Sequence, residues 1–169
     1  EEIESRAHKI IKKNFFMTKW ENSMAQPGCH DFVMVLDHLM PDFNVGKIFR
    51  SADFLGCREI HLVGIDFFNP SPAMGGFRHV PAKFLKKFSD SYDDLLKNDY
   101  DLIALDPNAN SNIFDITLKS KSAFIIGHEQ RGLSFDLDQF PKIKKVKIPN
   151  FGQAQSLNAS VAASIAMYE

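Results

Sequence analysis

The sequence is poor in cysteine and has no long apolar run, and each shortage excludes a class of protein. Its 169 residues include two cysteines, Cys29 and Cys57, which lack metal-ligand spacing and rule out a disulfide scaffold. No stretch approaches the roughly eighteen apolar residues of a membrane span, and no apolar signal segment opens the chain. Membrane and secreted proteins are therefore disfavoured, and we expect a cytoplasmic protein.

Tryptophan and tyrosine are also rare, and the net charge is small. One Trp and three Tyr stand beside 16 Phe, and these Phe residues are not spaced like a base-stacking platform, so we expect them to fill the core. A net charge of −1 argues against a non-specific nucleic-acid coat. The basic residues nevertheless form three groups, at 6–19, 78–87 and 142–147, which are either a phosphate-binding face or ordinary solvated surface.

Short apolar runs alternate with helical patterns along the chain. Runs rich in β-branched and aromatic residues, typical of strands buried on both faces, predict strands at 32–36, 60–63, 102–105, 123–126 and 145–148. Helical spacing predicts helices at 3–20, 45–55, 93–98 and 157–168. Gly56 is expected to end the second helix, and Ser89 or Ser91 to cap the third.

This alternation predicts an α/β fold, a three-layer domain with a mostly parallel sheet. No linker, repeat or low-complexity tract divides the chain, so we expect one domain over 1–169, with 1–25 as a basic, helical N-terminal extension. In such sheets ligands bind beyond the carboxyl ends of the strands. The loops that follow the predicted strands hold most of the glycines and all the Asn–Gln clusters, so we expect the site there.

The common enzyme motifs are missing from these loops. Neither the dinucleotide-binding nor the phosphate-loop glycine pattern occurs, so a general nucleotide-binding α/β domain would lack its phosphate loop. No zinc motif or Cys–His cluster is present, and we predict no metal. No G-x-S-x-G elbow indicates a hydrolase.

Three segments remain: NVGKIFR at 44–50, IGHEQRGLS at 126–134 and IPNFGQAQSLNASVA at 148–162. In this order and at these separations they resemble the three motifs of the TrmH/SpoU family, within the SPOUT superfamily of RNA methyltransferases. The resemblance runs from about residue 32 to residue 169. It implies an S-adenosylmethionine-dependent enzyme that methylates a ribose 2′-hydroxyl of RNA and works as a homodimer. It also implies a C-terminal trefoil knot, which the spacing of the motifs does not predict and base rates oppose.

The first motif holds the expected catalytic residues Asn44 and Arg50. Taken alone, Asn44 is a good helix cap and Arg50 a surface partner of Asp53. The resemblance makes Arg50 the catalytic arginine. Because a guanidinium stays protonated in proteins, we expect Arg50 to bind the adjacent phosphate and to stabilise the developing alkoxide rather than to act as a simple base.

The second and third motifs supply the rest of the implied site. Glu129 is expected to order the site, although an acid near a helix N-terminus is the simpler explanation. Ser156 and Asn158 would shape the reaction centre, although Ser156 alone looks like the cap of the last helix. His128 occupies a variable position and receives no role. The implied S-adenosylmethionine contacts are backbone groups near Leu105, Gly127, Ile148 and Leu157.

Two other functions stay open. A related enzyme could methylate a base nitrogen, although the pattern around Asn44 and Arg50 argues against it. A non-catalytic RNA-binding module could keep the same fold, although all three motifs are intact. The expected partner is RNA, with tRNA favoured over rRNA because the chain is compact.

Overall fold

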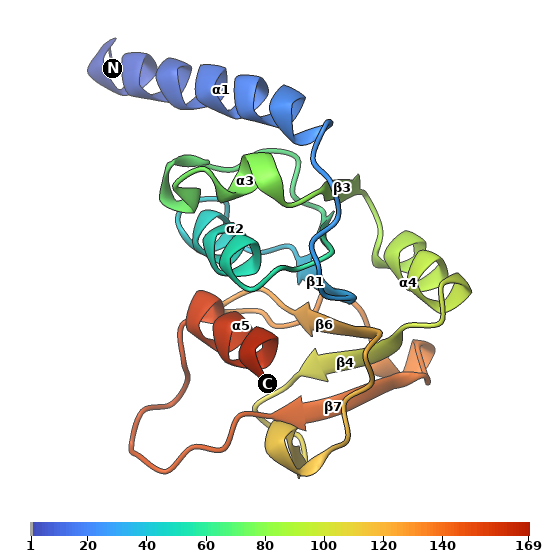
Figure 1. The fold of residues 1–169 in the computed structure, drawn as a ribbon. Coiled ribbons are helices and arrows are strands. Elements are labelled where there is room, and N and C mark those ends of the chain that lie inside the picture. The colour runs from blue at the N-terminus through green and yellow to red at the C-terminus, as the bar shows by residue number, and fades with distance from the viewer. Residues whose placement is uncertain (1) are drawn as a thin grey trace.

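The computed structural model describes residues 2–169, with side chains from residue 6 onward, and has the three layers of an α/β fold (Figure 1). The strands are β1 (Phe32–Asp37), β2 (Glu59–Val63), β3 (Ala82–Leu85), β4 (Asp101–Leu105), β5 (Ser111–Asn112), β6 (Ser122–Ile126) and β7 (Ile143–Lys147). The helices are α1 (Glu2–Asn22), α2 (Asn44–Phe54), α3 (Gly76–His79), α4 (Phe88–Lys97) and α5 (Ala159–Tyr168). The helix at 3–20 and the α/β fold are therefore confirmed.

The seven strands form one sheet in the order β3-β2-β1-β6-β4-β7-β5, and every pair is parallel. The central strands β1 and β6 are almost wholly buried, as their continuous apolar sequences predict. Because all strands run the same way, the loops after β1, β6, β4 and β7 emerge at one edge. The elements that carry the three motifs therefore start from neighbouring strands.

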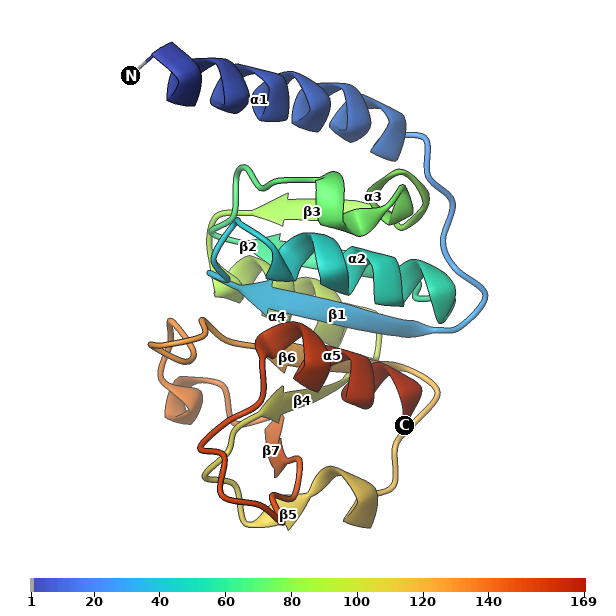
Figure 2. The ribbon, with the colours of Figure 1, turned by 90° about the vertical axis from the view of Figure 1, so that its left-hand side faces the viewer.

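Each face of the sheet has its own apolar core. The face under α2, α3 and α5 holds the larger cluster, which includes Phe49, Phe68 and Phe77. The face under α4 holds the smaller one, where Phe88 and Phe135 stack with ring centroids 3.7 Å apart. Figure 2 shows α2 and α5 side by side in front of the sheet and α4 behind it. The abundant Phe residues thus supply core volume on both faces, as expected.

The N-terminal helix α1 is attached at the β3 end of the sheet. Phe15 is 1% exposed and packs edge-on against Phe67 and Phe68, at centroid distances of 4.9 and 5.3 Å. The buried Asn22 side chain donates to the carbonyl oxygens of Phe77 (2.5 Å) and Val80 (2.7 Å). Each such buried amide hydrogen bond stabilises by about 1 kcal/mol, and together with Phe15 they fix the direction of α1.

The structure corrects several predicted boundaries. Strands β3 and β5 were not predicted, and β7 begins two residues before the predicted start at 145. Helix α4 starts at Phe88, so Ser89 and Ser91 lie inside it; neither caps it, because the cap residue Lys87 uses no side-chain hydrogen bond. Ser91 is instead buried against His61. Among the residues that the structure describes, no helix combines the length and apolarity needed to cross a membrane.

Candidate functional site

Helix α2 connects the first motif to the second. Its first residue, Asn44, donates a 2.7 Å hydrogen bond from Nδ2 to Oε1 of Glu129. Asn44 is therefore not the helix cap: the cap residue is Phe43, and no side-chain cap bond forms. Glu129 does lie beside a helix N-terminus, but this helix is α2, whose first residue Asn44 is 85 positions away in the sequence, and not a helix that follows β6.

Two carboxylates join the loop after β1 to the loop after β6. Glu129 accepts a second hydrogen bond, 3.1 Å long, from the backbone N–H of Met40. Asp37, at the end of β1, is fully buried and accepts from the backbone N–H and the hydroxyl of Ser134, at 2.6 and 2.8 Å. Charged acceptors bind such donors roughly twice as strongly as neutral ones. Asp37 was not among the predicted site residues, although an acid directly after a buried apolar strand was the available signal.

The residue after Asp37 adopts a backbone conformation that side chains other than glycine rarely take. His38 has φ 55°, in the left-handed region, and its Nδ1 lies 2.7 Å from Asp37 Oδ1. A conformation of this kind costs about 1 kcal/mol or more and persists where neighbouring contacts hold it. Together with the buried carboxylate, it constrains the backbone at the carboxyl end of β1.

The loop after β6 turns back on itself. His128 and Gly132 exchange two backbone hydrogen bonds of 2.8 and 2.9 Å, and Gly132 has φ 72°, a conformation that favours glycine. Nδ1 of the buried His128 accepts from the backbone N–H groups of Gln130 and Arg131. His128 thus has a local structural role, which its sequence position did not predict.

Gly127 gives one prediction at this loop. A Cβ on Gly127 would lie 2.5 Å from the carbonyl carbon of Gly132 and 2.7 Å from the backbone nitrogen of Leu133, and neither atom can move without opening the turn. We therefore expect Gly127→Ala to lower the free energy of unfolding by about 1–3 kcal/mol, as overpacking does. Denaturant unfolding measures this change. Gly152→Ala is the control, since the nearest atom there lies at 3.9 Å; equal stability of the two variants would contradict the prediction.

The second half of α2 packs against α5, the helix of the third motif. Ser51 and Ser164 hydroxyls lie 2.8 Å apart, and Ser164 also donates to the backbone oxygen of Ser160. Small side chains at this contact let the two helices approach closely. Arg50 does not pair with Asp53, whose Oδ2 lies 2.9 Å from Nδ1 of His79. The simple surface-pair reading of Arg50 is therefore wrong.

Arg50 is exposed and lines an open groove of about 1160 Å³ between α2 and α5. The groove presents large side chains with unusually high exposure: Phe54 is 87% exposed and Tyr168 is 82% exposed. Among residues 6–169, no hydrogen bond or ion pair joins Arg50 to Glu129 or to Asn158. Within one chain, Arg50 therefore lines the groove and takes no part in the hydrogen bonds of Glu129 and Asp37.

The third motif leaves β7 as an exposed loop and enters α5. Asn158 caps this helix: its Oδ1 accepts from the backbone N–H of Ser160 at 2.9 Å and from the Ser160 hydroxyl at 2.6 Å. Ser156 is exposed and is not the cap. Leu157 exposes half of its surface, and Phe151 is 94% exposed. Apolar side chains that open to solvent in a loop leave surface for a ligand or a partner.

Three of the four residues implied in cofactor binding lie where neighbouring strands end. Leu105 ends β4, Gly127 follows β6 and Ile148 follows β7, and β4 lies between the other two strands in the sheet. Leu157 belongs to the loop that continues from Ile148. These positions coincide with the edge at which parallel sheets bind ligands.

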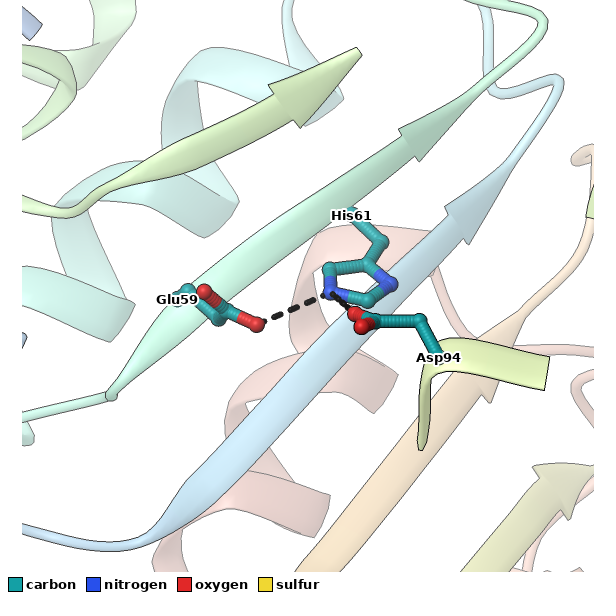
Figure 3. Close-up of side chains that lie close together, drawn as sticks. All are labelled: Glu59, His61 and Asp94. Atoms are coloured by element: carbon teal, nitrogen blue, oxygen red, sulfur yellow. Dashed lines mark hydrogen bonds and ion pairs between the residues drawn. The ribbon is translucent and has the colours of Figure 1, made fainter. Parts of the chain in front are cut away.

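A separate cluster of titratable groups lies between β2 and α4 (Figure 3). Nε2 of the fully buried His61 lies 3.0 Å from Glu59 Oε1 and 3.7 Å from Asp94 Oδ2. The three residues have ligand atoms within 4.8 Å of one another, as a metal site requires. The Lys83 ammonium, however, lies 2.9 Å from Glu59 and 2.8 Å from Asp94 and already bridges both carboxylates. We interpret the cluster as an ion-pair network that holds α4 on the sheet.

This cluster predicts a stability loss in acid. Burial alone raises the pKa of Glu59, but hydrogen bonds and charge from His61 and Lys83 outweigh burial and lower the pKa to about 2, against 4.5 for the free side chain. The stabilisation is therefore complete above pH 4.5 and is lost as the pH falls toward 2. It amounts to as much as about 3 kcal/mol. We expect the free energy of unfolding, measured with urea between pH 6 and pH 2, to fall less steeply with decreasing pH in Glu59→Gln than in the native chain. An equally steep fall in both would contradict the assignment.

Taken together, the fold and the site define a parallel α/β domain whose ligand site is built from loops at one sheet edge. The chain belongs to the SpoU rRNA Methylase family, whose model matches residues 31–168. A candidate TrmH family tRNA/rRNA methyltransferase of Staphylococcus epidermidis is 31% identical over 145 residues, which are 81% of this chain and 57% of that protein. A tRNA (guanosine(18)-2′-O)-methyltransferase of Borreliella burgdorferi is 29% identical, over 79% of this chain and 63% of that protein.

Solved structures show the same fold. The SpoU methyltransferase AviRb from Streptomyces viridochromogenes, in complex with AdoMet, superimposes with a TM-score of 0.74 at 28% identity, over 84% of this chain and 57% of that one. The A. aeolicus TrmH/SpoU tRNA modifying enzyme also gives 0.74, at 21% identity, over 94% of this chain and 81% of that one. The family assignment from the three motifs is confirmed. The chain spans little more than half the length of the S. epidermidis relative.

Proposed function

We propose that this protein transfers the methyl group of S-adenosylmethionine to a ribose 2′-hydroxyl of RNA, with tRNA as the favoured substrate over rRNA. The observation that carries the proposal is the position of α2. Its first residue binds Glu129 of the second motif, and Ser51 contacts the helix of the third motif. One short helix thus connects three segments that are far apart in the sequence, as a single reaction centre requires.

The residues present fit the cofactor. Leu105, Gly127 and Ile148 lie at the carboxyl ends of three adjacent strands, and the exposed side chain of Leu157 offers apolar surface to an adenine ring. When bound, S-adenosylmethionine supplies the electrophilic methyl group. The chain supplies a preorganised edge, because Asp37 and Glu129 hold the loop at 127–134 against the loop after β1.

Arg50 is proposed to act on the RNA. Its guanidinium stays charged and has five donors in a rigid plane, which suits a phosphate next to the target ribose. From there it would stabilise the negative charge that develops on the 2′-oxygen as its proton passes to a phosphate oxygen or to water. Transfer of the methyl group to this oxygen would leave the sulfonium sulfur as a neutral thioether. Asn44 and Glu129 are proposed as positioning residues, since each is engaged by the other in this chain. Ser156 and Asn158 are proposed to line the reaction centre from the third motif.

We further propose that a second copy of this chain covers the groove between α2 and α5. The groove is open, and its large apolar side chains are well exposed: Phe54, Val161 and Tyr168 are 87, 46 and 82% exposed. A self-complementary contact there would bury this surface and bring partner residues beside Arg50. The C-terminal trefoil knot remains a prediction of the family resemblance.

The test of the activity uses the full chain with radiolabelled S-adenosylmethionine and, separately, unfractionated tRNA and rRNA. We expect label in ribose-methylated nucleosides, which also protect the adjoining phosphodiester from alkali because the 2′-hydroxyl is blocked. Label in base-methylated nucleosides would contradict ribose methylation. Calorimetry without detectable S-adenosylmethionine binding, alongside normal RNA binding, would indicate a non-catalytic module.

Val161→Glu tests the dimer, since it places a charge on the exposed surface of α5 in the groove. Light scattering should report twice the monomer mass for the native chain and the monomer mass for the variant. A native chain that stays monomeric at micromolar concentration would contradict the proposed dimer.

A further inference from the structure

The outer face of α1 presents aromatic and basic side chains that the proposed site does not use. Lys9, Lys13, Phe16 and Trp20 follow one another at spacings of four, three and four, which places them on one side of the helix. Phe16 and Trp20 are 55 and 68% exposed. We call these four residues the outer face of α1. Figures 1 and 2 show α1 at the periphery of the molecule, beyond β3 and α3.

Packing of α1 uses little of this face: the Phe16 ring meets the Phe15 ring edge-on at a centroid distance of 5.6 Å, and more than half of Phe16 stays exposed. The opposite side of the helix holds the buried residues Phe15, Thr18 and Asn22. Lys19 also belongs to the packed side, since its ammonium lies 3.9 Å from the centroid of the Phe84 ring. Exposed Phe and Trp side chains therefore remain on a helix whose attachment is already complete, and such exposure is typical of a binding surface.

The charge of this surface selects the kind of partner. Arg6, Lys9, Lys12 and Lys13 are exposed, and among residues 6–169 none of them forms an ion pair, whereas Arg78 pairs with Glu21 at 2.7 Å. Exposed cations followed along the helix by exposed aromatic rings match a nucleic-acid strand, whose phosphates need cations and whose unstacked bases need flat surfaces. A second copy of α1 would instead bring cations against cations.

The direction of α1 connects this surface to the site. The His8 ring lies 6.0 Å from that of Phe67, which follows β2 at the sheet edge that carries the site loops. The cation-rich half of α1 therefore lies toward that edge. Lys9 and Trp20 are eleven residues apart, or about 16 Å along the helix axis. A strand that leaves the site along α1 would meet the cations first and the tryptophan last.

We propose that the outer face of α1 binds the RNA substrate beyond the target nucleotide. Lys9 and Lys13 contact backbone phosphates, and an unpaired base stacks on Trp20 with Phe16 beside it. This inference rests on the proposed function for its choice of RNA. It adds a second contact region, remote from the methyl acceptor, that governs affinity for the substrate rather than the chemical step.

Trp20 is the only tryptophan of the chain, so its fluorescence reports this surface directly. Titration of the full chain with unfractionated tRNA should quench the emission as a base stacks on the indole. Lys9→Gln/Lys13→Gln should weaken tRNA binding and reduce the slope of log affinity against log salt by about 1.4, the value for two single-strand phosphate contacts. Trp20→Ala should weaken binding about tenfold, and Trp20→Phe should restore most of the loss.

Lys97→Gln/Lys142→Gln is the matched control, because it also removes two positive charges. Both positions are exposed and lie shortly before β4 and β7, where the amino ends of the strands face away from the site loops. Calorimetry with S-adenosylmethionine checks that each variant keeps its cofactor site. If the α1 variants bind tRNA as the native chain does while methyl transfer persists, this inference is wrong and the proposed function stands. If tRNA does not quench Trp20, two other results would overturn the inference. A blue shift of the Trp20 emission with anionic vesicles would assign the surface to a membrane, and a blue shift with rising protein concentration would assign it to a second copy.

Discussion

Arg50→Ala is expected to lower the rate of methyl transfer about 100- to 1,000-fold, the usual effect of removing one donor that stabilises developing negative charge. The side chain is exposed and makes no ion pair within residues 6–169, so the substitution should leave the free energy of unfolding unchanged. Single-turnover transfer from labelled S-adenosylmethionine to tRNA measures the rate. Arg50→Lys should also be severely impaired, because an ammonium cannot make the planar paired contact of a guanidinium.

Lys47→Ala is the control, since Lys47 lies in the same groove one turn earlier on α2. Cofactor affinity, measured by calorimetry, should stay the same in Arg50→Ala, because the proposed cofactor contacts come from residues outside α2. Near-normal turnover by Arg50→Lys would remove the argument for bidentate phosphate binding. A loss of cofactor binding in Arg50→Ala would move Arg50 from the RNA side of the site to the cofactor side.

Asp37→Ala is expected to lower both stability and activity. The substitution removes a fully buried carboxylate and leaves the Ser134 N–H and hydroxyl without their acceptor. Buried donors that lose a charged partner cost about 3 kcal/mol or more in the free energy of unfolding. The loop at 127–134 also loses its attachment to the end of β1, so affinity for S-adenosylmethionine should fall. Urea unfolding and calorimetry measure the two effects.

Ser134→Ala separates the parts of this contact, because it removes the hydroxyl bond and keeps the backbone bond. Its loss of stability should be about 1 kcal/mol. Asp93→Ala, at an exposed position of α4, should change stability by less than about 0.5 kcal/mol. If Asp37→Ala unfolds at the same urea concentration as Asp93→Ala, the buried carboxylate is not what holds the two loops together.

Apolar runs predicted the central strands well and the edge strands poorly. β1, β2, β4 and β6 were placed to within one residue at each end, because burial on both faces gives an uninterrupted apolar signal. β3 has only partly buried or exposed residues, and β5 has two residues, so neither carries that signal. β7 was displaced because Lys144 and Lys145 are exposed near the edge of the sheet.

Local patterns identified the site residues but not their contacts. Asn44 and Glu129 were both singled out, yet the bond between them could not be predicted because 85 residues separate them and only the sheet order brings them together. Two helix-cap interpretations, of Asn44 and Ser91, failed for a related reason. A cap prediction considers the polar residue nearest a helix start, whereas the tertiary contacts of Asn44 and Ser91 already occupy their side chains.

The position of β1 sets a limit on how the protein can be made. β1 is the first strand in the chain and lies at the centre of the sheet, where it pairs on one side with β6, about ninety residues later. Native order at the centre therefore waits until residue 126 has been synthesised, and non-local pairing of this kind makes folding slow. A nascent chain that stops before β6 leaves one hydrogen-bonding edge of β1 unpaired, and an open edge on a central apolar strand favours aggregation.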